Sequence, residues 1–338
     1  MDNWVLIGPK MLEKQSLGEQ TVTATQVKVR ITHVLVTNYD ALTYSGNLKI
    51  AYPKTIGRVA IGVVTKAGES CYGVKEGARV YLNAVHACGK CYNCRSGNRG
   101  ECTDPKVAGD DFNGFLRDFT VCEYTDVTVI PDSVDDLSAL CIEFVALAEN
   151  IYDKLNLSTG SNVAIVGGGF LGSVFAQIAL YHKLVPIVID NFTQNIDRLK
   201  KSGVFFTFPA DDSLKDNIES ATSGKLCDAA IYTSTSKLSP SVPANVLARN
   251  KDMVIGGFSR VNFMLDVGPL FEKNLRMYSV SDGYGYIEGA INMIVHGALD
   301  LSHFQKETLK EFDLATLLTE LADKPMMNSK MTVLKLIF

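Results

Sequence analysis

Short runs of β-branched and aromatic residues, separated by glycines, dominate the first part of the chain. Residues 20–85 and 119–130 are rich in Val, Thr, Ile and Tyr. The segments 21–37, 57–68 and 78–85 each predict a strand, because such residues pack well on a pleated surface. Several short strands with turn residues between them indicate a barrel-like all-β region.

Apolar residues then recur at helical spacing from Leu137 to Leu155, and strands and helices alternate after Asn162. The expected helices include one that ends near His182 and one over 195–202. The expected strands are 162–168, 186–190, 205–208, 228–234 and 252–258. This alternation predicts a parallel sheet with crossover helices, the doubly wound class of α/β fold.

Near the end of the chain, the pattern of apolar residues predicts one amphipathic helix over 289–301 and a closing strand over 330–338. A closing strand this far from the β-rich part is expected to return to it, which makes the doubly wound unit an insertion. We therefore predict a barrel domain over 1–148, a doubly wound domain over 149–282 and a return to the barrel domain over 283–338.

The composition excludes several classes of protein. The 338 residues are 46% hydrophobic and 21% charged, which is ordinary for a globular chain and excludes a disordered one. The 33 basic and 37 acidic residues are evenly mixed, so a nucleic-acid partner is not expected. The N-terminus lacks the basic stretch and apolar core of a signal peptide, and we expect a cytoplasmic location.

The uncharged segment 163–181 is about long enough to span a membrane. It contains the glycine-rich run GGGFLG at 167–172, which a strand, a turn and a helix explain far better than a membrane span does. We therefore expect no membrane association.

This glycine motif follows an apolar strand and opens an apolar helix. We expect Gly167 to make the tight turn, Gly169 to let the backbone approach a pyrophosphate, and Gly172 to allow close packing of helix and strand. Phe170 and Leu171 are assigned to the cofactor site with these glycines. A plain glycine turn is the alternative, but strand, helix and a later acidic residue occur together here.

Asp190 is that acidic residue, and it ends the second expected strand of the doubly wound unit. A carboxylate there can hydrogen-bond an adenosine ribose and repels a 2′-phosphate, which favours NAD over NADP. Asp190 can also cap the following helix, and the two roles can coexist. Ser234 and Gly257 complete the predicted cofactor-binding residues.

Four cysteines are bunched at Cys88, Cys91, Cys94 and Cys102. Four thiolates on a tight loop suit tetrahedral zinc, and an all-cysteine set leaves no open position for a substrate, so we predict a structural zinc site. An iron–sulfur cluster also uses four cysteines, but this spacing lacks the usual pattern that ends in Cys-Pro. The remaining cysteines are predicted to be small core residues: Cys71, Cys122, Cys141 and Cys227.

With these motifs in this order, the chain resembles the medium-chain dehydrogenase/reductase superfamily, and within it the zinc-containing alcohol and polyol dehydrogenases. The resemblance covers nearly the whole length and includes the segments 73–82 and 246–258, the cysteine lobe, the glycine motif and Glu143. It implies a GroES-like barrel domain with an inserted Rossmann domain, NAD(H), and one structural zinc per chain. It also implies a homodimer or homotetramer that pairs through an edge strand at 275–280.

The same resemblance points to a catalytic zinc site whose ligands are largely replaced. Thr37 stands where the family has a cysteine ligand, and Arg58 where it has a histidine ligand, while Glu143 still matches a ligand position. Threonine is a poor zinc ligand, and arginine cannot be one because its guanidinium stays protonated. We expect a pocket without catalytic zinc.

In the family, the aspartate equivalent to Asp40 orients the metal-binding histidine. If Arg58 takes the place of that histidine, Asp40 and Glu143 flank its charge, and we predict a hydrogen bond from Arg58 to one of them. Two interpretations stay open: an ion-pair cluster that fills a lost metal site, or a cation that polarises a substrate carbonyl or binds an acidic group. Tyr39 either packs its ring or donates a proton.

The function that these residues favour is hydride transfer between NAD(H) and an alcohol/carbonyl pair of a small molecule. Polyols and sugar derivatives are the substrates that the resemblance implies. The alternatives are a zinc-independent reductase of an activated C=C or C=N bond, and a non-catalytic nucleotide-binding protein.

Overall fold

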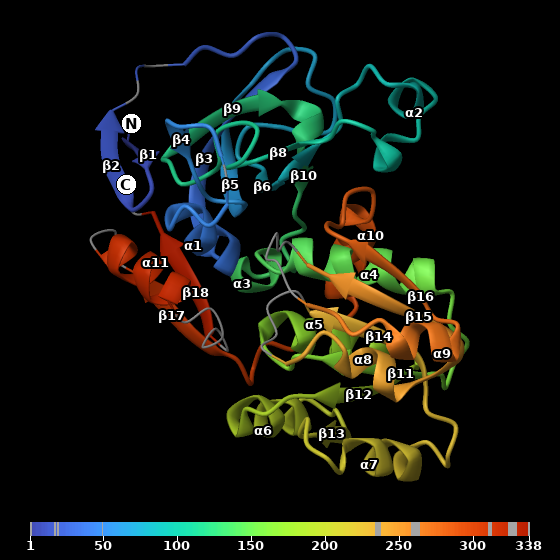
Figure 1. Ribbon diagram of the computed structural model, residues 1–338. Coiled ribbons are helices and arrows are strands. Elements are labelled where there is room, and N and C mark those ends of the chain that lie inside the picture. The colour runs from blue at the N-terminus through green and yellow to red at the C-terminus, as the bar shows by residue number, and fades with distance from the viewer. Residues whose placement is uncertain are drawn as a thin grey trace. The chain divides into compact units, whose positions relative to one another are not determined.

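The structure is a computed structural model, and it describes the chain except for residues 1, 17, 19, 49, 234–237, 258–263, 310–312, 324–329, 337 and 338. The chain forms two compact units (Figure 1). Unit 1 comprises Met1–Ile142 and Lys306–Phe338, and unit 2 comprises Glu143–Gln305. The observed boundaries, at 142/143 and 305/306, differ from the predicted 148/149 and 282/283.

The boundaries differ because two helices belong to unit 2. Helix α4 (Ile142–Leu155) begins at the first boundary, and the side-chain amide of Asn150 donates a 2.8 Å hydrogen bond to the carbonyl of Asp282. Helix α10 (Ile287–Val295) follows and buries Ile287, Ala290 and Ile291. The segment after Asp282 therefore stays with unit 2, and the return to unit 1 starts later.

Unit 1 is built on antiparallel strands. A seven-stranded sheet has the order β10-β6-β5-β3-β18-β17, with β9 also paired to β3, and a three-stranded sheet has the order β2-β1-β4. The strands of the first sheet are β3 (Gln26–Val36), β5 (Val59–Ala67), β6 (Arg79–Leu82), β9 (Phe119–Glu123), β10 (Val127–Val129), β17 (Gln305–Leu309) and β18 (Lys330–Lys335). The other strands are β1 (Asp2–Gly8), β2 (Met11–Ser16), β4 (Lys54–Thr55), β7 (Val85–His86) and β8 (Lys106–Val107). The helices are α1 (Asn38–Tyr44), α2 (Tyr92–Arg95), α3 (Asp136–Ala139), α11 (Leu314–Asp323) and the 3-10 turns Arg99–Glu101 and Tyr124–Asp126.

Strand β3 organises this unit because it pairs along both of its edges. One edge pairs with β5, and the other pairs with β9 over Gln26–Arg30 and with β18 over His33–Val36. Alternate residues Val27, Val29 and Ile31 are buried in the core of the unit. The predicted return of the closing strand to the β-rich part is therefore confirmed.

Unit 2 contains a six-stranded parallel sheet in the order β13-β12-β11-β14-β15-β16. Its strands are β11 (Asn162–Val166), β12 (Val185–Ile189), β13 (Phe206–Phe208), β14 (Cys227–Thr233), β15 (Leu247–Gly256) and β16 (Arg276–Val280). Its other helices are α5 (Phe170–Tyr181), α6 (Thr193–Lys201), α7 (Leu214–Ala221), α8 (Val242–Val246) and α9 (Gly268–Lys273). This is the predicted doubly wound fold, and the predicted edge strand is β16.

Two predicted helices differ in extent from the observed ones. The helical pattern from Leu137 to Leu155 is divided between α3 and α4, and the division lies next to the boundary between the units. The predicted helix over 289–301 is the shorter α10, because Gly297 adopts a φ of 79° just beyond its end.

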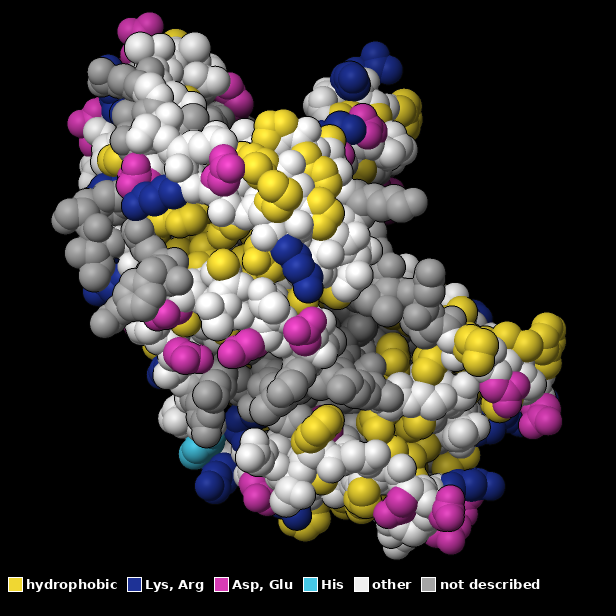
Figure 2. Space-filling view, turned by 60° about the vertical axis from the view of Figure 1, so that its left-hand side comes forward, with side chains coloured by type: hydrophobic (Ala, Val, Ile, Leu, Met, Phe, Trp, Pro, Cys, Tyr) yellow, Lys and Arg dark blue, Asp and Glu magenta, His cyan; other side chains and the backbone are white. Residues whose placement is uncertain are grey.

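Within the described residues, no helix combines the length and the apolar character that a membrane span requires. Acidic and basic side chains are interspersed on the face of the protein that Figure 2 shows. This agrees with the even mixture of charges along the sequence.

Candidate functional site

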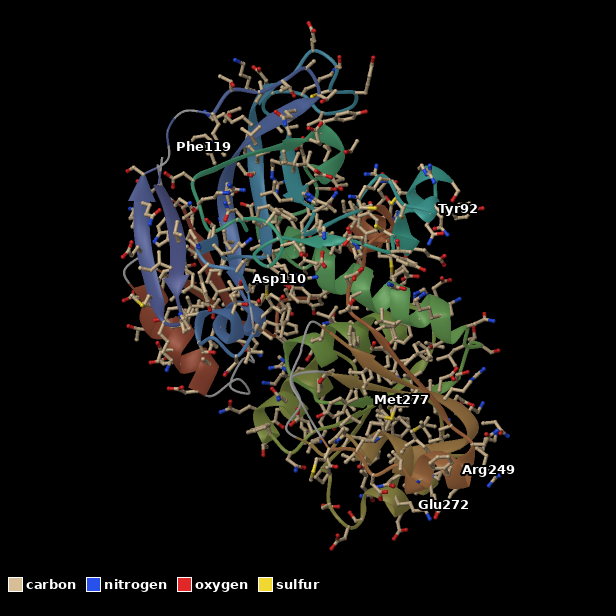
Figure 3. The ribbon with its side chains drawn as sticks, turned by 45° about the horizontal axis from the view of Figure 1, so that its top comes forward. Tyr92, Asp110, Phe119, Arg249, Glu272 and Met277 are labelled. Atoms are coloured by element: carbon tan, nitrogen blue, oxygen red, sulfur yellow. The ribbon has the colours of Figure 1, made fainter. Side chains whose placement is uncertain are left out.

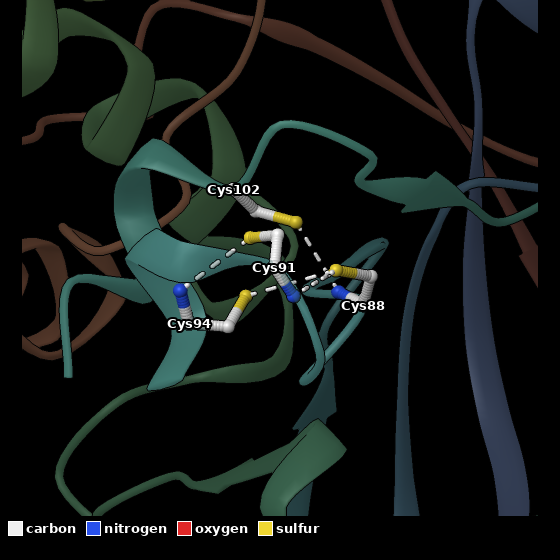
Figure 4. Close-up of side chains that lie close together, drawn as sticks. All are labelled: Cys88, Cys91, Cys94 and Cys102. Atoms are coloured by element: carbon white, nitrogen blue, oxygen red, sulfur yellow. Dashed lines mark hydrogen bonds between the residues drawn. The ribbon is translucent and has the colours of Figure 1, made fainter. Parts of the chain in front are cut away.

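The four bunched cysteines converge on one point in unit 1 (Figure 4). Their sulfur atoms all lie within 4.8 Å of one another, and the Sγ atoms of Cys88 and Cys94 are 3.9 Å apart. Zn–S bonds of about 2.3 Å in a tetrahedron require sulfur separations of roughly 3.8 Å. The cluster therefore fits a single zinc ion, whereas a cluster of several irons needs its sulfurs farther apart.

Backbone N–H groups donate hydrogen bonds to these sulfurs and lower the pKa of Cys88 and Cys91. The N–H groups of Cys91 and Cys88 donate to the sulfurs of Cys88 and Cys102 over 3.4 and 3.2 Å. Donation from the backbone of Thr103 and Cys94 lowers the pKa of Cys91 to about 5. Desolvation instead raises the pKa of Cys94 to about 12, and a cation bound among the four sulfurs would favour its thiolate.

The predicted glycine turn in unit 2 has the expected backbone geometry. Gly167 follows β11 with a φ of 102°, and Gly169 is the N-cap of α5. A Cβ atom at Gly172 would lie 1.8 Å from the carbonyl oxygen of Gly167, so glycine is required for the close approach of helix and strand. A Cβ atom at Gly169 would meet open space, which leaves that backbone accessible to a ligand.

Phe170 and Leu171 contribute apolar packing at the start of α5. The Phe170 ring makes edge-to-face contacts with the rings of Phe144 and Phe304 at 5.1 and 5.4 Å. Leu171 is buried. Gly257 has a φ of 124° and donates its N–H to the carbonyl of Val280, while Ser234 lies outside the described residues.

Asp190 lies beside the glycine turn and is buried. Its Oδ2 atom accepts hydrogen bonds from the N–H of Gly168 (2.6 Å) and from the side-chain amide of Asn195 (3.0 Å). Its Oδ1 atom accepts the N–H of Phe192 at the start of α6 over 2.8 Å. The carboxylate therefore binds the backbone just before α6, but the predicted N-cap role is wrong, because Phe192 is the N-cap residue and no side chain caps the helix by a hydrogen bond.

Arg198 is a residue of this site that the sequence analysis missed. Its Nη2 atom donates to the carbonyl of Gly168 (2.8 Å), to Ser173 Oγ (3.1 Å) and to Asn195 Oδ1 (3.1 Å). Asp190 and Arg198 thus hold the two polar groups of the Gly168 backbone. One feature of the sequence could have indicated that Arg198 is buried. It lies next to Leu199 and three positions after Asn195, so helical spacing places all three residues on the buried face of α6.

A second polar cluster lies in unit 1 where α1 begins. Thr37 is the N-cap of α1 and forms a capping box with Asp40. The Oδ2 atom of Asp40 accepts the N–H of Thr37 (2.8 Å) and its hydroxyl (2.6 Å), and Oδ1 accepts the N–H of Gly57 (3.1 Å). Burial raises the pKa of Asp40, while these hydrogen bonds and the charge of Arg58 oppose the rise.

Arg58 and Tyr39 complete this group, which we call the α1 cluster (Thr37, Tyr39, Asp40 and Arg58). Arg58 is buried, and its guanidinium carbon lies 5.3 Å from the centre of the Tyr39 ring. The Tyr39 hydroxyl donates a 3.1 Å hydrogen bond to Asp110, which Figure 3 labels. The sequence analysis missed Asp110, because it lies 71 positions from Tyr39 and belongs to no motif.

Comparisons with known proteins agree with this architecture. Residues 23–132 match the alcohol dehydrogenase GroES-like domain. An uncharacterised zinc-type alcohol dehydrogenase-like protein of Haemophilus influenzae is 23% identical and aligns over 88% of both chains. A sorbitol dehydrogenase of Halalkalibacterium halodurans is 27% identical over 65% of both chains. The crystal structure of an alcohol dehydrogenase from Escherichia coli in complex with NADH superposes with a TM-score of 0.86, at 22% identity and over 99% of both chains.

These comparisons support the resemblance of the chain to the medium-chain dehydrogenase/reductase superfamily, and residues 23–132 match its GroES-like domain. The resemblance to this superfamily implies two sets of zinc-ligand positions in the chain. At the structural set, the four cysteines come together as a complete donor set. Thr37 instead caps a helix, and Arg58 provides a cation. Glu143 is buried in the first turn of α4, in unit 2. Thr37 and Arg58 do not fit a catalytic zinc, and the predicted hydrogen bond of Arg58 to Asp40 or Glu143 stays a prediction.

Proposed function

We propose that this chain is an NAD(H)-dependent oxidoreductase that transfers a hydride between the nicotinamide and the alcohol/carbonyl pair of a small molecule. The glycine turn at the start of α5, with Asp190 beside it, carries the proposal. The relation to a sorbitol dehydrogenase supports a polyol or a sugar derivative as the substrate. We also propose one structural zinc per chain, held by the four cysteines.

The turn suits a dinucleotide because a helix N-terminus attracts phosphate and Gly169 leaves the backbone open. The described hydrogen bonds use three of the roughly four lone-pair sites of the Asp190 carboxylate, which leaves room for a ribose hydroxyl. The negative charge of Asp190 would repel a 2′-phosphate, so we propose NAD(H) rather than NADP(H).

The α1 cluster supplies what a zinc-free reduction of a carbonyl needs. Bound NADH supplies the hydride. The Arg58 guanidinium would stabilise the negative charge that develops on the substrate oxygen, and Asp40 would hold Arg58 in orientation. The Tyr39 hydroxyl would give that oxygen its proton, and the half-buried Asp110 would connect Tyr39 to solvent. In alcohol oxidation the proton moves in the opposite direction.

We also propose that copies of the chain associate through β16. This strand ends the sheet of unit 2, and Met277, labelled in Figure 3, is 43% exposed on it. A strand edge with apolar side chains that pairs with none of the described strands favours pairing with a second copy. Sedimentation at micromolar concentration should show a dimer or tetramer, and a monomer would contradict the proposal.

Metal content and cofactor use test the proposed function together. Gently purified protein should contain one zinc per chain, bind NADH more tightly than NADPH, and oxidise NADH with some members of a panel of polyol-derived carbonyl compounds. Two zincs per chain would overturn the zinc-free active site. Turnover only with activated C=C or C=N substrates, or NADH binding without any turnover, would overturn the proposed reaction.

A further inference from the structure

One buried aromatic ring contacts the side chains on both sides of the glycine turn. It belongs to Phe304, which lies between α10 and β17, far along the chain from the turn, and is 5% exposed. The guanidinium carbon of Arg198 lies 5.0 Å from the centre of this ring. The ring also makes an edge-to-face contact with that of Phe170, the residue after Gly169, and the two centres are 5.4 Å apart.

Arg198 fixes the direction of a backbone N–H group in the turn. It donates to the carbonyl of Gly168 over 2.8 Å, and the hydroxyl of Ser173 donates to the same carbonyl over 3.2 Å. The peptide bond from Gly168 to Gly169 is trans and planar, so its N–H points away from its carbonyl. The N–H of Gly169 is therefore directed away from Arg198, at a residue where a Cβ atom would meet open space.

The Phe304 ring stabilises Arg198 in this position. Arg198 is a buried cation: burial lowers its pKa, and the charge of Asp190 opposes that shift. Three hydrogen bonds from its Nη2 atom go to neutral oxygens, on Gly168, Ser173 and Asn195. The face of an aromatic ring carries partial negative charge, so the Phe304 ring compensates part of the guanidinium charge and favours one orientation of it.

The contact with Phe170 acts on the other side of the turn. Phe170 is the first residue of α5, and its ring also contacts the ring of Phe144 in α4, with centres 5.1 Å apart. A displacement of the first turn of α5 would change both aromatic contacts. The start of this helix is therefore connected through Phe170 to two other segments of unit 2.

We infer that Phe304 is a positioning residue for the cofactor. It orients Arg198 and the first residue of α5, and through them the backbone N–H groups that receive the pyrophosphate. The inference rests on the proposed binding of NAD(H) at the glycine turn. The aromatic face is the required property, because an aliphatic side chain can fill much of the space but cannot compensate a guanidinium.

Hydrogen exchange of the protein without cofactor, followed by NMR, tests the positioning. The N–H groups of Gly168 and Ser173 are hydrogen-bonded, and in Phe304→Leu they should exchange at least about fivefold faster than in the unmodified protein. Phe304→Tyr keeps the aromatic face and should restore the original rates. The matched control is Phe206→Leu, which removes a half-buried ring from another apolar cluster of unit 2 and should leave these rates unchanged.

Fluorescence titration with NADH gives a second measurement. Phe304→Leu should weaken NADH binding about fivefold, whereas Phe304→Tyr and Phe206→Leu should change it less than about twofold. If Phe304 acts through Arg198, Phe304→Leu should cause little further loss in an Arg198→Met background. A purely structural role would lower the urea midpoint without this dependence on Arg198.

The positioning role and the proposed function fail in different ways. If the unmodified protein does not bind NADH, the proposed function is wrong and this inference falls with it. If the unmodified protein binds NADH, three results would each overturn the positioning role alone: equal binding by Phe304→Leu, an equal loss in Phe304→Tyr, or an undiminished effect in the Arg198→Met background. Unchanged exchange of Gly168 and Ser173 in Phe304→Leu would overturn it as well.

Discussion

The cysteine lobe and the α1 cluster are two polar sites in unit 1 that use their side chains in opposite ways. In the lobe, four sulfurs converge within 4.8 Å, and backbone N–H groups donate to them. In the α1 cluster, Thr37 and Asp40 bind the start of α1 and the N–H of Gly57, and Arg58 lies over the Tyr39 ring. The lobe is arranged to receive a cation, whereas the α1 cluster contains its own.

Under the proposed function, this difference means that a guanidinium takes the place of the positive charge of a catalytic metal within the same fold. A guanidinium is a permanent cation, so its burial requires a nearby carboxylate and a compatible surface. Asp40 and the Tyr39 ring provide both. Four substitutions can break or sharpen the comparison between the two sites.

The largest effect is expected in the lobe. Cys94→Ser should lose the zinc and the order of residues 88–102, because structural zinc contributes on the order of 10 kcal/mol of apparent binding free energy in small zinc peptides. Elemental analysis and hydrogen exchange over this segment measure both losses. Cys71→Ser, at a half-buried cysteine outside the lobe, should keep its zinc. One zinc per chain in Cys94→Ser, or disulfides among the four cysteines, would refute the structural site.

Arg58→Met should have the next largest effect. Removing one member of a buried charged pair costs about 3–5 kcal/mol of unfolding free energy, since the other charge stays buried. Urea unfolding measures this, with the exposed Arg95→Met as the control for loss of an arginine. A cost below about 1 kcal/mol would mean that Arg58 does not compensate Asp40. If Arg58→Met also leaves a detected reductase activity unchanged, Arg58 is structural and the proposed catalytic role is wrong.

Asp190→Ala extends the comparison to the glycine turn of unit 2. The loss of charged hydrogen bonds, about 1.5–3 kcal/mol each, should weaken NADH binding roughly tenfold to a hundredfold. Fluorescence titration with NADH measures the change. Asp197→Ala removes an exposed carboxylate from α6, the helix that follows Asp190, and should bind NADH like the unmodified protein. Tighter binding of NADPH than NADH to the unmodified protein would contradict the assignment.

The smallest expected effect is a pH dependence in the α1 cluster. The raised pKa of Asp40 in the folded state gives a contribution to stability that is present below the ordinary carboxyl pKa and is lost as the pH rises through the raised value. The free energy of unfolding of the unmodified protein minus that of Asp40→Asn should therefore be larger at pH 4 than at pH 7, because the unmodified protein is relatively more stable at the lower pH. A relative stability that grows with pH would show that the hydrogen bonds and Arg58 outweigh burial.

Local features of the sequence determined much of this protein. The cysteine lobe was predictable because its ligands lie within one short segment, where chain connectivity already brings them close. The two sheet types followed from the period of the apolar residues. The glycine turn followed from the spacing of its glycines between a strand and a helix, and the structure shows that Gly172 admits no side chain. The contact of Asp190 with the backbone two residues away is also local, although Phe192 and not Asp190 is the N-cap residue of α6.

The tertiary structure alone decided the contacts between residues far apart in the chain. It brought Asp110 to Tyr39, buried Arg198 against the carbonyl of Gly168, and placed Phe304 against Arg198 and Phe170. It also assigned the segment after Asp282 to unit 2. Charged side chains such as Arg198 look like surface residues in a sequence, because the partners that make their burial favourable come from distant segments.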